Sequence, residues 1–197
     1  NDGNIWVTNK GSATISVISP STLAITRTIA LPRASQPFGL VFSPVDGSAW
    51  VALEAGGKVL KLASANGSQL GAIDVGSTPR HLSMTADGTR LLVSRFISPP
   101  LPGESTASVQ DQSAGADRGG EVVVVRTANA SVERTVVLKV SKRADSTVQG
   151  RGVPNYLGAA VIRPDGSDAW VPSKQDNVQR GLVRDGKPLD FQNSVRA

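Results

Sequence analysis

A short phrase built around Asp-Gly occurs four times in this chain, and it limits the possible folds more than any other feature of the sequence. The four copies are NDGNIWVTN (1–9), VDGSAWVAL (45–53), ADGTRLLVS (86–94) and PDGSDAWVP (164–172). Asp-Gly between two apolar runs is a strong signal for a β-hairpin, because glycine accepts the positive φ that such a turn requires. The chain therefore repeats one hairpin.

The segments around each hairpin repeat as well. An apolar strand is expected before the hairpin at 37–43, 79–85 and 156–163, and another after it at 14–19, 58–63 and 121–127. A more polar strand closes the unit at 25–31, 69–75 and 132–138. A period of about forty residues with four strands per unit is typical of a β-propeller blade. We therefore predict an all-β fold, a β-propeller of four-stranded antiparallel blades.

The number of units predicts an incomplete ring. About three and a half blades are present over residues 1–197, whereas a propeller closes with about four to eight. An open arc would expose large apolar blade faces to water. We expect a partial propeller that has about seven blades when complete, with the remainder supplied by more chain, another copy or another subunit.

The composition excludes several classes of function. The chain has no cysteine, which excludes disulfides, thiolate chemistry and haem attached through C-x-x-C-H. No apolar run approaches the length of a membrane-spanning helix, and no signal-peptide pattern is present. The net charge is +5 without any block of basic residues, so we expect a generally basic surface and no nucleic-acid partner.

Three stretches carry a resemblance to a known family. They are IWVTNKGSATISVIS (5–19), FGLVFSPVDGSAWVAL (38–53) and VGSTPRHLSMTADGTRLLVS (75–94), and they resemble the YVTN-type β-propeller repeat. The resemblance implies a bacterial protein in the periplasm or outside the cell. The longer segments 94–104 and 171–197 resemble those of propellers beside a c-type cytochrome or cytochrome-peroxidase-like domain. That resemblance implies haem in a neighbouring domain or partner, and no cofactor within this chain.

Three insertions are expected to emerge on one face of the propeller. Strand direction alternates within a blade, so the Asp-Gly hairpins lie at one end of the blades. The segments 97–119 and 173–197 follow second strands and 141–153 links two blades, which brings all three to the opposite end. Loops longer than about 12–15 residues are uncommon unless they are functional or disordered. This end is therefore the best candidate for docking a partner.

Six residues are candidates for contacts with a partner or ligand at that end. Arg80 and His81 begin an innermost strand near the central channel, and Asn155 and Tyr156 begin the next. Arg95 and Lys174 close second strands, where they could form a basic patch with Arg80. For each of them a structural ion pair, a place in the core or a solvated charge is the alternative. No metal site is expected from a single histidine without cysteine.

Other conspicuous residues are expected to be structural. The aspartates of the four phrases are interpreted as turn residues. The three tryptophans, Trp6, Trp50 and Trp170, are interpreted as core between blades, with Trp6 one place before the register of the other two.

Three functions remain open. The first is a non-catalytic scaffold or binding module that docks a protein partner or adjacent domain, for example a c-type cytochrome, through the insertion-bearing end. The second is an enzyme of the lactonase or quinoprotein dehydrogenase type with Arg80 and His81 in the channel mouth. The third is a cell-surface protein that binds an anionic polymer. We expect binding rather than catalysis.

Overall fold

The structure is a computed structural model that describes residues 3–99, 118–141 and 152–176. These residues form strands, turns and loops without any helix. The first sheet contains β1 (Ile5–Asn9), β2 (Thr14–Ile18) and β3 (Ile25–Ala30). The second contains β4 (Pro37–Phe42), β5 (Ala49–Leu53), β6 (Lys58–Leu62) and β7 (Gln69–Asp74). The third contains β8 (Pro79–Met84), β9 (Arg90–Arg95), β10 (Gly119–Arg126) and β11 (Ser131–Lys139).

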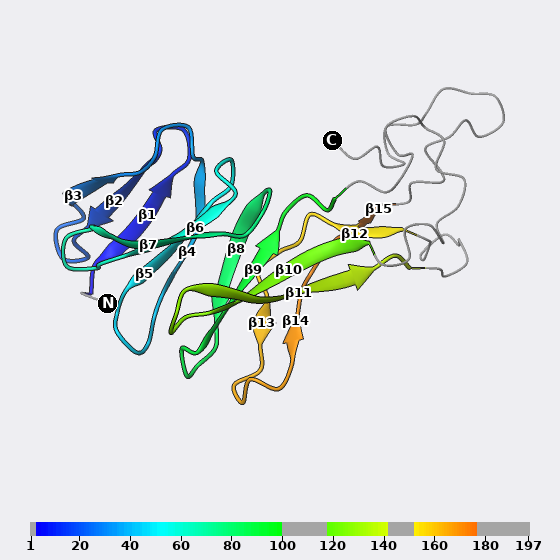
Figure 1. Ribbon diagram of the computed structural model, residues 1–197. Helices are drawn as coiled ribbons and strands as arrows, with labels where there is room; N and C mark the ends of the chain where they lie inside the picture. The colour runs from blue at the N-terminus through cyan, green and yellow to red at the C-terminus, as the bar shows by residue number, and fades with distance from the viewer. Residues whose placement is uncertain (1–2, 100–117, 142–151, 177–197) are drawn as a thin grey trace, which may run out of the picture.

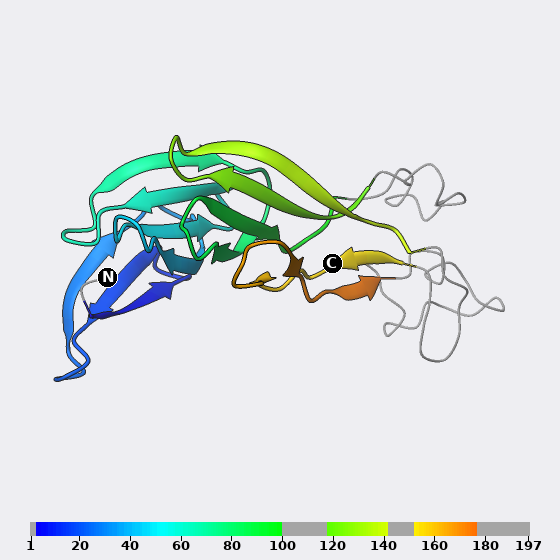
Figure 2. The ribbon, with the colours of Figure 1, turned by 90° about the horizontal axis from the view of Figure 1, so that it is seen from below.

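The sheets follow one another in chain order, from β1–β3 at the left of Figure 1 to β12–β15 at the right. The last strands form a hairpin in two pieces: β12 (Val153–Asn155) pairs with β15 (Lys174–Asp176), and β13 (Val161–Ile162) pairs with β14 (Ala169–Trp170). Seen from below, the long strands β10 and β11 extend from the third sheet toward β12 (Figure 2). The predicted all-β architecture with antiparallel four-stranded sheets is confirmed.

The Asp-Gly turns form as the repeat predicts. Gly47, Gly88 and Gly166 have φ of 66°, 68° and 73°, which glycine adopts without strain. Each preceding aspartate accepts a hydrogen bond from the backbone N–H two residues later, at 3.1 Å for Asp46 and 3.0 Å for Asp87 and Asp165. The Thr85 hydroxyl, together with Thr89, lowers the pKa of Asp87 to about 2. These three aspartates are turn residues, and Asp2 lies outside the described residues.

β5 explains how neighbouring sheets are held together. Side chains alternate across a strand, and β5 is buried on both sides. Ala49, Val51 and Leu53 join an apolar cluster with the first sheet, whereas Trp50 and Ala52 join a cluster with the third. The core is therefore a series of layers between stacked blades.

Strands β4 and β8 approach each other closely. A Cβ added to Gly39 would lie inside contact distance of the Arg80 carbonyl oxygen and 3.0 Å from the Leu82 backbone nitrogen. These two strands begin their sheets, and the close approach requires a residue without a side chain at position 39. The first strands of successive blades thus line up side by side.

The fourth unit departs from the repeat. The expected strand 156–163 is a strand only at Val161–Ile162, and a second short strand lies earlier, at Val153–Asn155. Tyr156 turns the chain between them, with a φ of 50°, and the Gly158 N–H donates to the Pro172 carbonyl oxygen at 2.8 Å. The hairpin is therefore interrupted rather than continuous, and the expected insertions 141–153 and 173–197 each include part of a strand.

The tryptophans share one register but not one environment. Trp6, Trp50 and Trp170 are each the second residue of their strands, so the expected offset of Trp6 is wrong. Trp50 is 0 % exposed and Trp6 is half-buried against the cluster between the first two sheets. Trp170 is 57 % exposed, and its cross-strand neighbour Val161 is also exposed. The prediction that Trp170 lies in the core is wrong, because no described sheet packs on its side of β14.

Candidate docking face

The described residues that flank the three insertions are joined by hydrogen bonds. The Ser98 N–H donates to Asn155 Oδ1 at 2.8 Å, and the Asn155 amide donates to Asp176 Oδ2 at 2.7 Å. Ser141 and Gly152 form a backbone bridge, and the Gln175 amide donates to the Gly152 carbonyl oxygen at 3.3 Å. We call the end of the blades that carries these residues the insertion face and the opposite end the hairpin face. The insertions themselves lie largely outside the described residues.

Asn155 and Asp176 form the centre of this polar joint. Both side chains are fully buried. The Lys174 ammonium lies 3.1 Å from Asp176 Oδ1, opposite the oxygen that Asn155 contacts. A buried amide with both ends hydrogen-bonded fixes the backbone segments that it joins. Asn155, a candidate for partner contact, is therefore a structural link between insertion bases.

Arg80 forms an ion pair between two blades. Its guanidinium donates to both Glu54 carboxylate oxygens, at 2.9 and 2.6 Å. Lys10, from the first sheet, donates to the same carboxylate at 3.1 Å. Burial alone would raise the pKa of Glu54, but the hydrogen bonds from Arg80 and Lys10 outweigh it and hold the pKa below its ordinary value. Glu54 was absent from the sequence prediction because a single acidic residue after a strand carries no distinguishing signal.

Cationic and aromatic side chains contact one another in a row along the insertion face. The ring-centroid distances are 5.8 Å from Lys10 to Phe38, 5.0 Å from Arg80 to Phe38 and 3.1 Å from Arg80 to Phe96. Phe96 contacts Tyr156 at 4.9 Å between rings, and the Lys174 ammonium lies 5.2 Å from the Tyr156 ring. We call these six residues the rim row. It connects all four units and contains three of the six candidates, namely Arg80, Tyr156 and Lys174.

His81 lies beside the rim row. Its ring meets Phe38 edge-on at 5.2 Å between centroids. Burial, followed by the charge of Arg80, lowers the pKa of His81 below its ordinary value. The imidazole is therefore neutral at pH 7 and occupies a packing position.

Arg95 does not contribute an open positive charge. Its guanidinium pairs with Glu121 and donates to the Ser77 carbonyl oxygen at 2.8 Å and to the Ser77 hydroxyl. The expected basic patch of Arg80, Arg95 and Lys174 is therefore largely neutralised, because Glu54 and Glu121 pair with the two arginines. Neither acidic partner was identifiable from sequence spacing, since each lies 26 residues from its arginine.

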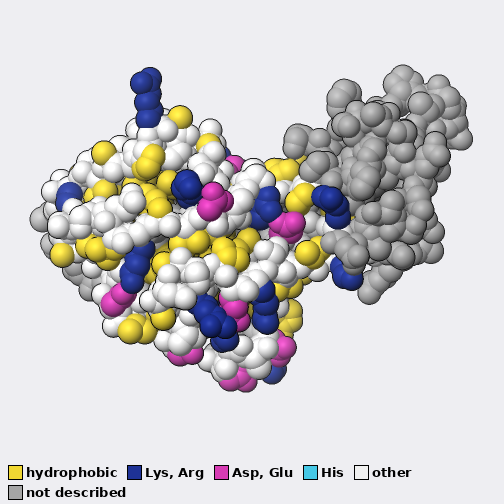
Figure 3. All heavy atoms as spheres, viewed as in Figure 1, with side chains coloured by type: hydrophobic (Ala, Val, Ile, Leu, Met, Phe, Trp, Pro, Cys, Tyr) yellow, Lys and Arg dark blue, Asp and Glu magenta, His cyan; other side chains and the backbone are white. Residues whose placement is uncertain are grey.

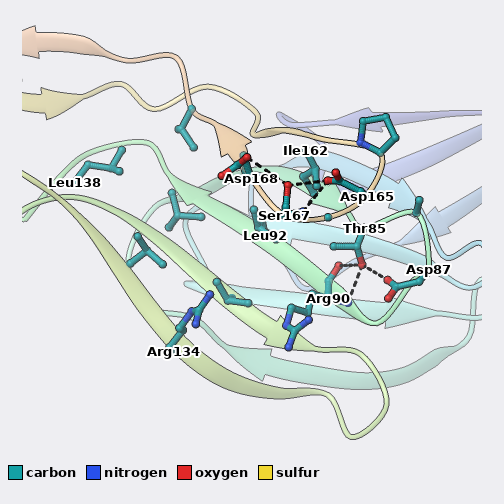
Figure 4. Close-up of a pocket in the computed structure, with 18 residues that line it drawn as sticks. Thr85, Asp87, Arg90, Leu92, Arg134, Leu138, Ile162, Asp165, Ser167 and Asp168 are labelled. Atoms are coloured by element: carbon teal, nitrogen blue, oxygen red, sulfur yellow. Dashed lines mark hydrogen bonds between the residues drawn. The ribbon is translucent and has the colours of Figure 1, made fainter.

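A groove of about 540 Å³ lies away from this face, between the third sheet and the last hairpin. Figure 4 shows Arg90, Arg134, Leu92 and Leu138 on one side and the turn with Asp165, Ser167 and Asp168 on the other. In the second sheet the corresponding place beside β5 is taken by β6 and β7. The groove thus lies at the place that the third and fourth strands of a blade occupy in the second sheet.

Metal binding and membrane spanning are two further possibilities, and neither has support in the described ranges. No group of three or more His, Cys, Asp or Glu side chains there is arranged to hold a metal ion. Nor do those ranges contain a helix that could cross a membrane.

Solved structures with the same architecture are β-propellers or propeller-like proteins. Hydrazine synthase of Kuenenia stuttgartiensis superposes with a TM-score of 0.57 and 14% identity, over 93% of this chain and 56% of that one. The WD40 β-propeller domain of Doa1 gives 0.57 and 12%, over 87% and 44%. A putative 6-phosphogluconolactonase from Bacteroides uniformis gives 0.57 and 16%, over 88% and 48%. This chain thus spans about half of each, and the likeness shows a partial β-propeller fold.

Sequence comparisons add nothing to this result. No family model and no curated protein matches the chain. The predicted propeller is confirmed by the solved structures alone. At this level of identity a structural likeness establishes the fold of this chain and says nothing of its activity.

The Arg80–Glu54–Lys10 cluster predicts a pH-dependent contribution to stability. Replacing Glu54 by glutamine should lower the free energy of unfolding by about 1–2 kcal/mol at pH 7. Because the folded-state pKa of Glu54 lies below the ordinary value of 4.5, this contribution is present above pH 4.5 and is lost as the pH falls through the folded-state pKa. Urea unfolding of both proteins across that range tests it.

The control is Asp168→Asn, in an exposed ion pair on the hairpin face, which should change the free energy of unfolding by less than about 0.5 kcal/mol. A Glu54 effect of constant size at all pH values would contradict the assignment.

Proposed function

We propose that this partial propeller is a non-catalytic binding module that docks a protein partner or a neighbouring domain through its insertion face. The observation that supports this most directly is the polar joint of Ser98, Asn155 and Asp176. It fixes the starting points of separate insertions relative to one another. Binding residues are often carried on loops held by a rigid scaffold, and this joint supplies such a scaffold.

The resemblance of the repeats to the YVTN type extends the proposal. It implies a bacterial protein in the periplasm or outside the cell. The separate resemblance of segments 94–104 and 171–197 to propellers beside a c-type cytochrome implies such a domain as the neighbour. Haem would then belong to that neighbour, because this chain has no cysteine to attach it. Absorbance of the complex in the Soret region tests for that partner.

The other two functions have weaker support. Arg80 is engaged by Glu54 and stacked on Phe96, so its guanidinium is not open to a substrate in the channel mouth. For an anionic polymer a continuous basic surface is required. On the side shown in Figure 3, lysine and arginine side chains are scattered among acidic and apolar ones.

Site-specific photo-crosslinking tests which face docks the partner. A photoreactive amino acid is placed at Ser12 or Ala55 on the insertion face, and at Val45 or Ala86 on the hairpin face as matched controls. All four positions are exposed. In cells that contain the native partner, we expect an adduct of one defined mass from the insertion-face positions only. Adducts of that mass from the hairpin-face positions alone, or equally from both faces, would contradict the proposal.

A further inference from the structure

The insertion face presents more open cations than open carboxylates. One carboxylate of the described residues there is open: Asp74, at the end of β7, is 75% exposed beside Lys58, which is itself 48% exposed. The other carboxylates of this face are engaged and more deeply buried. Glu54 is paired with Arg80 and Lys10, Glu121 with Arg95, and the fully buried Asp176 contacts Lys174. Lys10 and Lys174 nevertheless keep 42% and 55% of their side chains exposed. A docking partner therefore meets the ammonium groups of Lys10, Lys58 and Lys174 there and, among these carboxylates, only that of Asp74 in the open.

A further cation lies beside the same face. Arg33 is exposed in the loop between β3 and β4. This loop is held against the end of β5, because the Ala55 N–H donates to the Ser35 carbonyl oxygen at 3.1 Å. Arg33 thus adds an exposed charge to the insertion face, on a loop whose backbone is hydrogen-bonded to Glu54 and Ala55.

The hairpin face has a different balance. Asp46 and Asp168 are 46% and 60% exposed, each beside a basic residue, Lys61 or Arg163. Asp87 and Asp165 are exposed as well. The Asp-Gly turns of the second, third and fourth units each place a carboxylate at this end, so several open carboxylates lie among its cations, whereas Asp74 is the open carboxylate of the insertion face. A carboxylate-bearing partner is consequently favoured on the insertion face.

The rim row also has the composition of an interaction surface. Aromatic residues and arginine are enriched where binding energy concentrates, and Phe38 is an exposed large apolar side chain on this row. Its contacts with Lys10 and Arg80 hold it in place before any partner binds. Such preorganisation reduces the entropy lost on docking.

We infer that the rim row, together with Arg33, docks a protein surface rich in exposed carboxylates. The inference rests on the proposed docking function and adds the chemistry of the partner. Nucleic acid is disfavoured because bases bind by stacking on open aromatic faces, whereas the rings of the rim row are already in contact with its cations or with one another.

Binding of a fluorescent oligoglutamate peptide, measured by anisotropy, tests the inference, with an oligoglutamine peptide of equal length as the control probe. The purified chain should bind only oligoglutamate, more weakly as salt is added. The double variant Lys10→Gln, Arg33→Gln should weaken binding about fivefold. Arg33→Gln alone leaves the Glu54 cluster intact and should weaken it about twofold. The matched hairpin-face variant Lys61→Gln, Arg163→Gln should bind as the unmodified chain does.

Three results would overturn the inference: no salt-sensitive binding of oligoglutamate, equal losses in the two double variants, or tighter binding of a DNA duplex or an anionic lipid vesicle. The proposed function is judged separately by photo-crosslinking. Crosslinks confined to the insertion face without oligoglutamate binding would overturn the partner chemistry and leave the docking face in place.

Discussion

Replacing Trp50 by alanine should lower the free energy of unfolding by about 4 kcal/mol. Trp50 is fully buried and contributes to the apolar layer between the second and third sheets, together with Leu91, Val93 and Val123. Its removal deletes the largest fully buried side chain of the described residues and leaves a cavity between two four-stranded sheets. Urea unfolding followed by far-UV circular dichroism measures the loss.

Trp170→Ala is the matched control for this experiment. The residue type and the place in the strand are the same, but Trp170 is exposed and contacts Arg163 at 5.9 Å from its ring. The substitution should change the free energy of unfolding by less than about 1 kcal/mol. Equal losses for Trp50 and Trp170 would contradict the assignment of Trp50 to an inter-blade layer and of Trp170 to an open face.

A second large effect is expected at Gly39, where alanine should destabilise the protein by about 2–3 kcal/mol. The new methyl group would meet the backbone of β8 at Arg80 and Leu82. Backbone cannot move aside as a flexible side chain can, so β4 and β8 must separate and the Arg80–Glu54 pair is disturbed as well. Thermal unfolding and urea unfolding both report the change.

Gly71→Ala serves as the control. Gly71 lies in β7, and no atom lies within 4 Å of an added Cβ. Alanine reduces the conformational freedom of the unfolded chain, so stability should stay the same or rise by up to about 1 kcal/mol. A loss at Gly71 as large as that at Gly39 would show that the close approach of β4 and β8 is not the cause.

The fold could be predicted because its signals are local. The positive φ of Gly47, Gly88 and Gly166 and the apolar runs of the strands follow from neighbouring residues, and the spacing of the Asp-Gly turns gives the period of the blades. The bounds of the strands in the fourth unit were predicted poorly, because a local signal is missing there. Its strands at 153–155 and 161–162 are separated by a turn at Tyr156, and no glycine or proline pattern at that residue signals a positive φ.

The candidate site was only partly predictable. Topology alone predicts that Arg80 and Tyr156 begin strands at one face and that Lys174 ends one there. The three do lie in one row, but Tyr156 lies in the turn after β12 and Lys174 begins β15, so those two strand positions were wrong. Whether a cation at this face is open or neutralised depends on acidic partners far away in sequence, such as Glu54 for Arg80 and Glu121 for Arg95. Burial of Trp170 likewise depends on whether another sheet follows, which the strand itself does not encode.

Amide hydrogen exchange of the purified chain at low concentration tests the stacked-blade arrangement most directly. Strands covered on both faces should exchange slowly, so β5 should be the most protected. β14 pairs with β13 alone among the described strands and carries the exposed Trp170, so its amides should exchange fast. Slow exchange in β5 with fast exchange in β14 is the predicted result. Protection of β14 equal to that of β5, or fast exchange throughout β5, would contradict the account.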